Sequence, residues 1–500
     1  MENPSYLKRG WILAALMLTM SLAAMDATIV STAIPQIVAD LGGFQYFTWV
    51  FSIYMLSQTI TIPIYGKLSD LFGRKRILLI GIVLFLLGSA ACALSWDIFS
   101  LIVFRGLQGL GAGSIMATVN TIAGDIYTVQ ERAKIQGYLS SIWGISAILG
   151  PALGGTIVEY AHWSWIFFIN IPFGILSIIF LVVFFKEDIT IKKHKIDYVG
   201  ATLISLCLGL LLLLLIEGGQ SFPWFSLIGI GMVICVIALS FVIYRVEKQA
   251  PEPILPFWLW KNKTIFYTNM AMIGMGMVMI GPEVFLPTFT QAALGVGSIA
   301  SGLILGSMSV GWPTASALSG RLYLKIGFRA TSLIGTTLII LACIGFLILP
   351  YPQAIHWLVI DQIVLGAGFG LLSTPSLVGI QSLVKWEQRG VVTSTNLFTR
   401  NLGQSIGAAL YGAIFNHALM SQLKTTNIQV QGSNSNIIET INSDQIATSL
   451  KEMLRQAVHL SMTHIYWGLL FFALFIFFCI YRIPYRDPKD LSVIEIKRDK

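Results

Sequence analysis

Long apolar runs recur along the whole chain and are separated by short polar stretches. About 20 consecutive apolar residues span the hydrocarbon core of a bilayer as a helix, and a backbone in lipid must satisfy its own hydrogen bonds. The pattern therefore predicts an all-α integral membrane protein with fourteen transmembrane helices. The predicted spans are residues 11–33, 46–66, 77–95, 99–124, 134–158, 164–185, 199–217, 223–244, 264–290, 297–320, 330–350, 354–380, 391–418 and 462–482.

The basic residues are distributed unequally among the loops between these spans. If alternate loops and both termini are placed on one side, that side holds 27 of the 32 lysines and arginines. Lysine and arginine collect in the short cytoplasmic loops of membrane proteins. We therefore predict that both termini are cytoplasmic, and that the net charge of +8 reflects this sidedness rather than a nucleic-acid partner.

The composition, with 55% hydrophobic and 11% charged residues, makes the lipid bilayer the expected partner of most of the surface. The five cysteines lie in apolar segments without C-x-x-C spacing, and no H-E-x-x-H or nucleotide-binding string occurs. These patterns predict no metal site, no cofactor and no enzymatic activity. The chain therefore has no sequence feature for the use of ATP.

Two parts of the chain resemble each other at a nearly constant offset. A series of glycines and one arginine recurs 257 residues later, and the loop string G-x-L-x-x-x-x-G at Gly66 recurs 254 residues later at Gly320. Many transporters are built from two parallel helical halves. The matched positions are Gly109, Gly111, Gly113, Arg132, Gly150 and Gly155 with Gly366, Gly368, Gly370, Arg389, Gly407 and Gly412.

This repeat predicts two six-helix bundles with two inserted helices between them. We place the N-terminal bundle at 1–190, the inserted pair with its linkers at 191–258, the C-terminal bundle at 259–483 and a cytoplasmic tail at 484–500. The C-terminal bundle would contain an outer loop at about 419–461. Within that loop, helical spacing predicts a short amphipathic helix on the outer surface, formed by Ile446, Leu450, Met453, Leu454, Ala457 and Val458.

The loop after the second predicted span carries a charged string, GKLSDLFGRKR, from Gly66 to Arg76. Glycine permits a tight reversal, and an aspartate can pair with basic neighbours or cap a helix. Such a cluster can latch the cytoplasmic ends of two bundles in one state and release them in another. The alternative is a plain basic loop on the cytoplasmic side. We predict that Gly66, Asp70, Gly73 and Arg74 belong to a conformational switch.

With this loop, four further strings resemble motifs of the major facilitator superfamily, specifically its 14-helix drug:proton antiporter branch, over essentially the whole chain. The string at 163–174 has Ser164 where the branch usually has arginine, so this position has no charge that could take part in the function. The strings are residues 101–113 around a buried arginine (fourth helix), Gly144 with 150–155 (fifth helix of antiporters), 25–35 (first helix) and 163–174.

The resemblance implies the major facilitator fold and proton-coupled export of diverse lipophilic or cationic drugs across the cell membrane, by analogy a bacterial cytoplasmic membrane. Its partners would be drug-like molecules and protons. A dedicated exporter of a metabolite or peptide, and a nutrient importer of the same fold, stay open as alternatives. The glycine- and proline-rich fifth helix would allow close helix approach and bend during switching, through Gly150, Pro151, Gly154 and Gly155.

Two charges fall inside predicted spans, where an unpaired charge costs several kcal/mol. Asp26 lies about 15 residues into its helix and Arg105 about six into an oppositely directed one, so both are expected in the outer half of the membrane, close together. The resemblance favours proton coupling over a static ion pair. In that hypothesis Asp26 takes up a proton from outside and gives it up when Arg105 approaches.

The helix at 264–290 supplies the candidate substrate contacts. Met272, Met275, Met279 and Glu283 line one stripe, and methionine adapts to varied ligands. An acid at the end of this stripe would suit a lipophilic cation, and Glu283 could also share proton traffic. Ordinary core packing of the methionines is the alternative. Asp361 is expected near an outer helix end with access to water, so we assign it no role.

Overall fold

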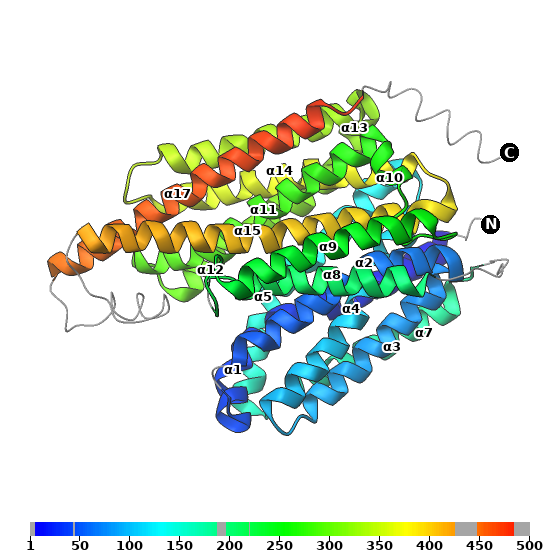
Figure 1. Cartoon of the computed structure of the whole chain (residues 1–500), viewed down its shortest axis with the longest axis horizontal. Helices are drawn as coiled ribbons and strands as arrows, with labels where there is room; N and C mark the ends of the chain where they lie inside the picture. The colour runs from blue at the N-terminus through cyan, green and yellow to red at the C-terminus, as the bar shows by residue number, and fades with distance from the viewer. Residues whose placement is uncertain (1–5, 44–45, 188–196, 220, 426–447, 485–500) are drawn as a thin grey trace. The chain divides into compact units, whose positions relative to one another are not determined.

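The computed structural model describes residues 6–43, 46–187, 197–219, 221–425 and 448–484. Over these residues the chain is helical and contains no strand, apart from an isolated bridge between Gly218 and Phe222. The helices are α1 Tyr6–Leu41, α2 Phe47–Phe72, α3 Arg74–Ala93, α4 Ile98–Ile126, α5 Val129–Tyr160, α6 Trp165–Phe168, α7 Asn170–Phe184, α8 Tyr198–Glu217, α9 Leu227–Gln249, α10 Trp258–Lys261, α11 Lys263–Ala292, α12 Ser298–Gly306, α13 Met308–Ile348, α14 Ile355–Ser382, η2 Trp386–Gln388, α15 Arg389–Thr425 and α17 Thr448–Tyr481 (Figure 1).

Every predicted span overlaps one of these helices, so the all-α prediction is confirmed. Within the described part of the chain, eleven helical segments are long and apolar enough to cross a membrane. Helices α2 and α15 are not among them, and residues Ile299–Ile348 form one run of 50 residues where the sequence predicts two spans. The number of crossings and the side of the termini therefore stay predictions.

The glycines that end the two repeated loops share an unusual backbone conformation. Gly73, between α2 and α3, has φ 96° and ψ 145°. Gly327 has φ 84° and ψ 162° and kinks α13 at the matching place of the second repeat. Side chains disfavour positive φ, so glycine is required for this reversal. The repeated loop thus forms the same turn in both halves of the sequence.

The chain folds into two compact units, which are described separately. The first comprises Met1–Phe266 and Leu377–Phe398, and the second comprises Tyr267–Ser376 and Thr399–Lys500. In the first unit α4 packs against α2 and α3, and α1 packs against α5 and α7. The inserted helices α8 and α9 lie side by side in this unit (Figure 1).

Glycines bring α4 close to two neighbours at once. A Cβ at Gly109 or Gly113 would collide with α2, at Tyr54 and Gln58 respectively, whereas one at Gly111 would collide with α3 at Gly81 and Phe85. These are backbone contacts, so the neighbouring helices could not yield by a side-chain movement. The matched glycines of α14 follow the same scheme in the second unit, since Gly366 and Gly370 face the first half of α13 and Gly368 faces its second half.

Helices α3 and α7 cap each other in the first unit. The carboxylate of Glu187, just after α7, accepts from the backbone N–H groups of Arg74 (3.0 Å) and Lys75 (2.8 Å) at the start of α3. In return, Lys75 Nζ donates to the carbonyl oxygens of Val182 (3.1 Å) and Phe185 at the end of α7. Helix ends have unsatisfied N–H and C=O groups, and each helix satisfies those of the other.

The last helix is longer than predicted. The segment expected to form a surface helix begins α17 at Thr448 and continues without a break to Tyr481. Leu454, Ala457 and Val458 are buried in the core of the second unit, so the prediction of a separate helix on the outer surface is wrong. Likewise α15 runs to Thr425, which leaves less of 419–461 for an outer loop; Ile446 lies outside the described residues.

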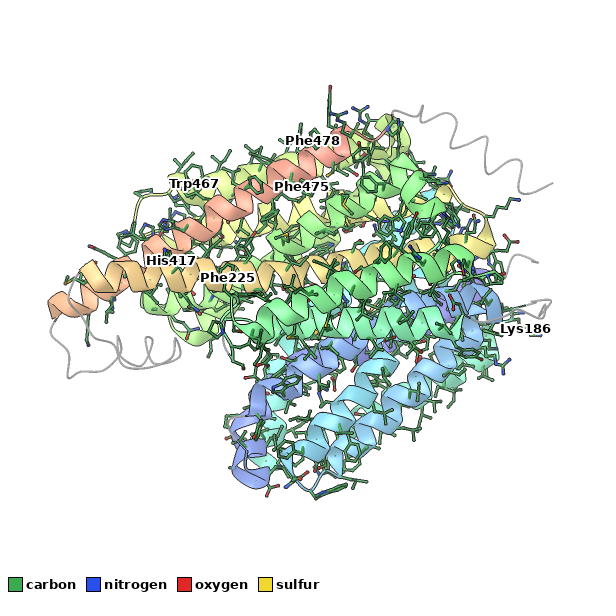
Figure 2. The ribbon with its side chains drawn as sticks, viewed as in Figure 1. Lys186, Phe225, His417, Trp467, Phe475 and Phe478 are labelled. Atoms are coloured by element: carbon green, nitrogen blue, oxygen red, sulfur yellow. The ribbon has the colours of Figure 1, made fainter. Side chains whose placement is uncertain are left out.

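The opposite face of α17 exposes large aromatic side chains. Trp467, Phe475 and Phe478 project from this helix (Figure 2). The tip between α8 and α9 likewise exposes Phe225. Such apolar faces are suited to contact with lipid.

Candidate functional site

The two charges inside predicted spans meet in the first unit. Arg105 Nη1 of α4 donates to Asp26 Oδ2 of α1 at 2.5 Å, and neither residue is exposed. The prediction that they lie close together is confirmed. The pair is buried among helices, where the attraction between unlike charges is strong and the cost of separating them is high.

Two amides complete the surroundings of the carboxylate. Gln108 Nε2 donates to Asp26 Oδ1 at 2.8 Å, and its Oε1 accepts from Arg105 Nη1 at 2.8 Å. Asn170, the first residue of α7, donates to Asp26 Oδ1 at 3.4 Å and to Ser89 Oγ at 3.0 Å. Both oxygens of Asp26 thus have donors, from α4 and α7.

Arg105 has further partners besides the acid. Its Nε donates to the carbonyl oxygen of Val50 at 3.2 Å, and its Cζ lies 4.2 Å from the ring centre of Tyr54 and 5.9 Å from that of Phe167. Electron-rich ring faces stabilise a guanidinium group. Arg105 would therefore keep several favourable contacts if Asp26 were neutralised.

The fifth-helix motif holds α5 close to the helix that carries Asp26. A Cβ at Gly150 would meet Thr28 of α1, and one at Gly154 would meet Ile29 and Thr32. Thr28 Oγ1 donates to the carbonyl oxygen of Ser146 at 2.9 Å, which joins the helices two residues beyond Asp26. Pro151 lies inside α5.

Gly155 differs from the two packed glycines, because a Cβ there would meet nothing within 4 Å. Close packing therefore explains Gly150 and Gly154 but not Gly155. The assignment of all four motif residues to switching stays a prediction.

The predicted switch loop forms a second charged cluster in the first unit. Asp70 accepts from the backbone N–H groups of Gly390 and Val391, both at 2.9 Å, at the start of α15. Arg74 Nη2 donates to the same carboxylate at 2.7 Å. A carboxylate at a helix N-terminus satisfies free N–H groups and interacts favourably with the helix dipole.

A second acid joins two arginines beside it. Asp125, near the end of α4, accepts from Arg74 Nε at 3.0 Å and from Arg389 Nη1 at 2.8 Å. The Arg74 guanidinium also lies 3.5 Å from the ring centre of Trp386. We call Asp70, Arg74, Asp125 and Arg389 with the first N–H groups of α15 the charge latch.

Burial dominates the electrostatics of Asp70. Removal from water raises its pKa to about 7, against the opposing influence of Arg74 and of the two backbone donors. Desolvation disfavours the charged form of an acid, whereas cations and N–H donors favour it. The charge latch is therefore sensitive to pH near neutrality.

Gly66 and Lys67 extend the contacts of this loop. A Cβ at Gly66 would collide with Ser394 and with the carbonyl of Gly390, so this position requires glycine. Lys67 Nζ forms a 2.5 Å ion pair with Glu252, which lies in the linker after the inserted helices.

In the second unit, the acid of the predicted substrate stripe faces α15. Glu283 of α11 interacts electrostatically with Arg400 and is hydrogen-bonded to Gln404. Gln404 Nε2 also lies 3.7 Å from Met279 Sδ. Glu283 follows Asp26 by 257 residues, the same offset that separates the matched glycines. Each unit thus has an acid at this repeated position.

The remaining methionines of the stripe lie in the core. Met272 is 1% and Met275 0% exposed, within the hydrophobic core of the second unit, whereas Met279 is only partly buried. In this conformation Met272 and Met275 act in core packing. Contact between them and a substrate stays a prediction.

Several residues of these clusters were not identified from the sequence. Gln108 and Asn170 fall inside strings that resemble family motifs, so the motifs held a signal for them. Asp125 had no such signal, because its partners lie 51 and 264 residues away in the sequence. Over the described residues, no group of three or more His, Cys, Asp or Glu side chains could hold a metal ion.

A polytopic helical protein with a charged pair and polar amides among its membrane helices has the features of a membrane transporter. The model of the Major Facilitator Superfamily matches residues 16–408. Multidrug resistance protein 3 of Bacillus subtilis (strain 168) is 35% identical over 428 residues, covering 85% of this chain and 83% of that protein. Multidrug efflux pump SdrM of Staphylococcus aureus (strain N315) is 31% identical over 404 residues, covering 80% and 88%.

The crystal structure of the human organic anion transporter MFSD10 (TETRAN) has the same fold, with a TM-score of 0.63 at 14% identity over 95% of this chain and 99% of that one. The chain belongs to the Major Facilitator Superfamily. It is a multi-pass transporter of the cell membrane and not an enzyme.

Proposed function

We propose that this transporter is a proton-coupled antiporter that exports structurally diverse lipophilic or cationic drugs from the cytoplasm by alternating access. The names of the bacterial relatives, a multidrug resistance protein and a multidrug efflux pump, support drug export. The buried pair of Asp26 and Arg105 supports the coupling and is the observation on which the proposal depends.

Asp26 is the proposed proton carrier. A proton on its carboxylate removes the negative charge and weakens the charge-assisted bond from Arg105 Nη1. Arg105 then keeps Gln108 Oε1, the carbonyl of Val50 and the ring of Tyr54 as partners. The pair can therefore open without leaving the guanidinium unsatisfied, which a reversible proton site requires.

The charge latch is the proposed conformational switch. Its closed form joins the last turn of α2 to the start of α15 through Asp70, and joins α3 to the same region through Asp125. Opening would break several charge-assisted bonds together, so the latch would hold one state until binding energy elsewhere compensates. Gly66 and Gly73 provide the close approach and the turn.

The second unit supplies the proposed contact for a cationic substrate. Glu283 is an acid near the adaptable thioether of Met279, and Gln404 contacts both side chains. A cationic drug would replace Arg400 as the partner of this carboxylate. The flexible thioether of Met279 would let drugs of different shapes bind without a rigid pocket. A neutral Glu283 would bind such a drug less well.

The test uses purified protein in liposomes with an imposed pH gradient and a fluorescent lipophilic cation as the probe. We expect accumulation that collapses when the gradient is dissipated, and proton movement opposite to the probe. Asp26→Asn should abolish both. Asp40→Asn is the matched control, because Asp40 is an exposed acid on the same helix. Gradient-independent accumulation, or full proton exchange by Asp26→Asn, would contradict the proposal.

A further inference from the structure

The second unit contains another acid that the sequence did not lead us to expect in its interior. Asp361 of α14 is 7% exposed, so the prediction of an acid near water is wrong. Gln362 Nε2 donates to its Oδ2 at 3.1 Å. Its Oδ1 lies only 3.4 Å from the place where a Cβ on Gly345 of α13 would stand. The carboxyl group is therefore enclosed between α14 and α13.

No cation compensates this carboxylate among the residues that the structure describes; its one polar contact is Gln362. The titratable groups that face it are the thiol of Cys343 on α13 and the hydroxyl of Tyr466 on α17. Tyr411 of α15 faces the same thiol. All three are neutral at physiological pH in an apolar interior. A buried carboxylate without a cation is unfavourable by several kcal/mol, so a bound proton is the simplest compensation.

The surroundings leave room for the hydrogen bonds that such a proton would need. Among the described residues, Gln362 Oε1 and Tyr411 Oη are buried without a hydrogen-bond partner, and the Tyr466 hydroxyl lies within reach of the Gln362 side chain; these side chains are at most 1% exposed. Buried polar atoms normally find partners, so a group of unpaired oxygens beside an acid indicates a site that gains or rearranges protons. A carboxylic acid, unlike a carboxylate, can donate to one of these acceptors.

We propose that Asp361 binds a proton in the interior of the second unit and forms a proton site separate from Asp26. The ligand is a proton rather than a metal ion, because a single carboxylate with an amide and phenol oxygens compensates one positive charge at most. Exit of the proton requires water to reach the α13–α14 contact at Gly345. The use of this proton in transport rests on the proposed antiport, but its binding does not.

The decisive experiment measures thermal unfolding of the full-length protein in detergent from about pH 5 to pH 8. A proton held by the folded state and released by the unfolded chain makes stability fall as pH rises. We expect the melting temperature of the wild type to fall across this range, and the fall to be smaller for Asp361→Asn, with the contribution of Asp70 remaining. Asp361→Glu should restore a pH-dependent step. Glu159→Gln, at an exposed acid near the end of α5, is the control and should keep the wild-type profile.

An Asp361→Asn profile equal to that of the wild type would overturn the proposal, as would sodium ions that raise the melting temperature of the wild type and not of Asp361→Asn. Substrate-induced proton release then tests the use of the site, with fewer protons expected per probe molecule from Asp361→Asn. If the wild type released no protons with any substrate, the antiport proposal would fail while the melting profiles would still decide whether Asp361 binds a proton.

Discussion

Arg105 combines several interactions that need the shape of its guanidinium group and not only its charge. Nη1 serves Asp26 and Gln108 together, Nε reaches the carbonyl of Val50, and the planar group lies over the ring of Tyr54. Lysine is a point charge without this fork.

We therefore expect Arg105→Lys to lower proton-coupled transport by about tenfold or more, since each lost charged hydrogen bond contributes about 1.5–3 kcal/mol. Coupled uptake of the probe in liposomes measures the effect. Arg76→Lys is the matched control, because Arg76 is exposed. Equal rates for the two variants would mean that charge alone suffices at position 105.

The sequence could predict the pair but not its surroundings. Asp26 and Arg105 stand out because charges inside apolar spans are rare, and helix depth alone brings them together. Gln108 and Asn170 lie 82 and 144 residues from Asp26; the motif strings mark the segments that contain them, but residue type alone does not show that these two amides contact the acid. Asp361 was predicted to lie near water because it falls close to the end of a predicted span, but the position of a residue along a span does not show whether neighbouring helices cover it.

At the scale of elements, the repeated glycines make a direct prediction about packing. A methyl group on Gly111 would meet backbone atoms of Gly81 and Phe85 on α3, whereas one on Gly155 of α5 would meet open space. We expect Gly111→Ala to lower the unfolding free energy by about 1–3 kcal/mol through overpacking. Gly155→Ala should be neutral or stabilising by up to about 1 kcal/mol.

Thermal unfolding of both alanine variants beside the wild type measures this difference. The two changes add the same methyl group to a helix, so intrinsic helix propensity cancels in the comparison. A Gly111→Ala protein as stable as Gly155→Ala would show that α3 and α4 are not as close as described.

The charge latch predicts a pH effect on one helix end. Burial raises the pKa of Asp70 to about 7, while an exposed aspartate titrates near 4. The closed latch therefore binds a proton that the open latch releases, so its stability is full below about pH 4, declines between about pH 4 and pH 7, and is constant above that range. We expect the amides of Gly390 and Val391 to lose hydrogen-exchange protection between about pH 4 and pH 7.

Asp70→Asn should remove this pH step in protection. An internal control exists at Ser100, whose amide donates to Asp97 at 2.7 Å. Hydrogen bonds from Ser100 lower the pKa of Asp97, so this carboxylate stays ionised and the Ser100 amide should keep constant protection over the same range. A step at Ser100 as large as that at Gly390 would point to global unfolding instead.

The start of α17 is a helix boundary that the hydrophobic pattern of the sequence predicted wrongly. Polar residues such as Lys451, Glu452 and Arg455 made the segment before the last span resemble a surface helix. The structure buries the opposite stripe, including Leu454 and Val458, and so extends α17 into the core. Periodicity predicted that this segment is helical and amphipathic, but it could not tell which partner its apolar face contacts.

At the scale of the whole molecule, the distribution of lysine and arginine predicts which side each loop occupies. The turn between α3 and α4 carries the exposed Trp96 and should lie outside. Lys186, which follows α7 (Figure 2), should lie in the cytoplasm. In a cysteine-free background, Trp96→Cys should react with a membrane-impermeant maleimide in intact cells. Lys186→Cys should react only in everted vesicles. Labelling of both sites in intact cells would refute the predicted topology.

The reciprocal caps of α3 and α7 have a consequence for synthesis. The first N–H groups of α3 are synthesised 113 and 112 residues before the carboxylate that accepts their hydrogen bonds. Until Glu187 emerges from the ribosome, water or another polar group must accept these hydrogen bonds. A nascent chain that stops short of this residue keeps a frayed helix start at the very loop that the charge latch uses. Closure of these caps thus marks the moment at which the first six predicted spans are complete.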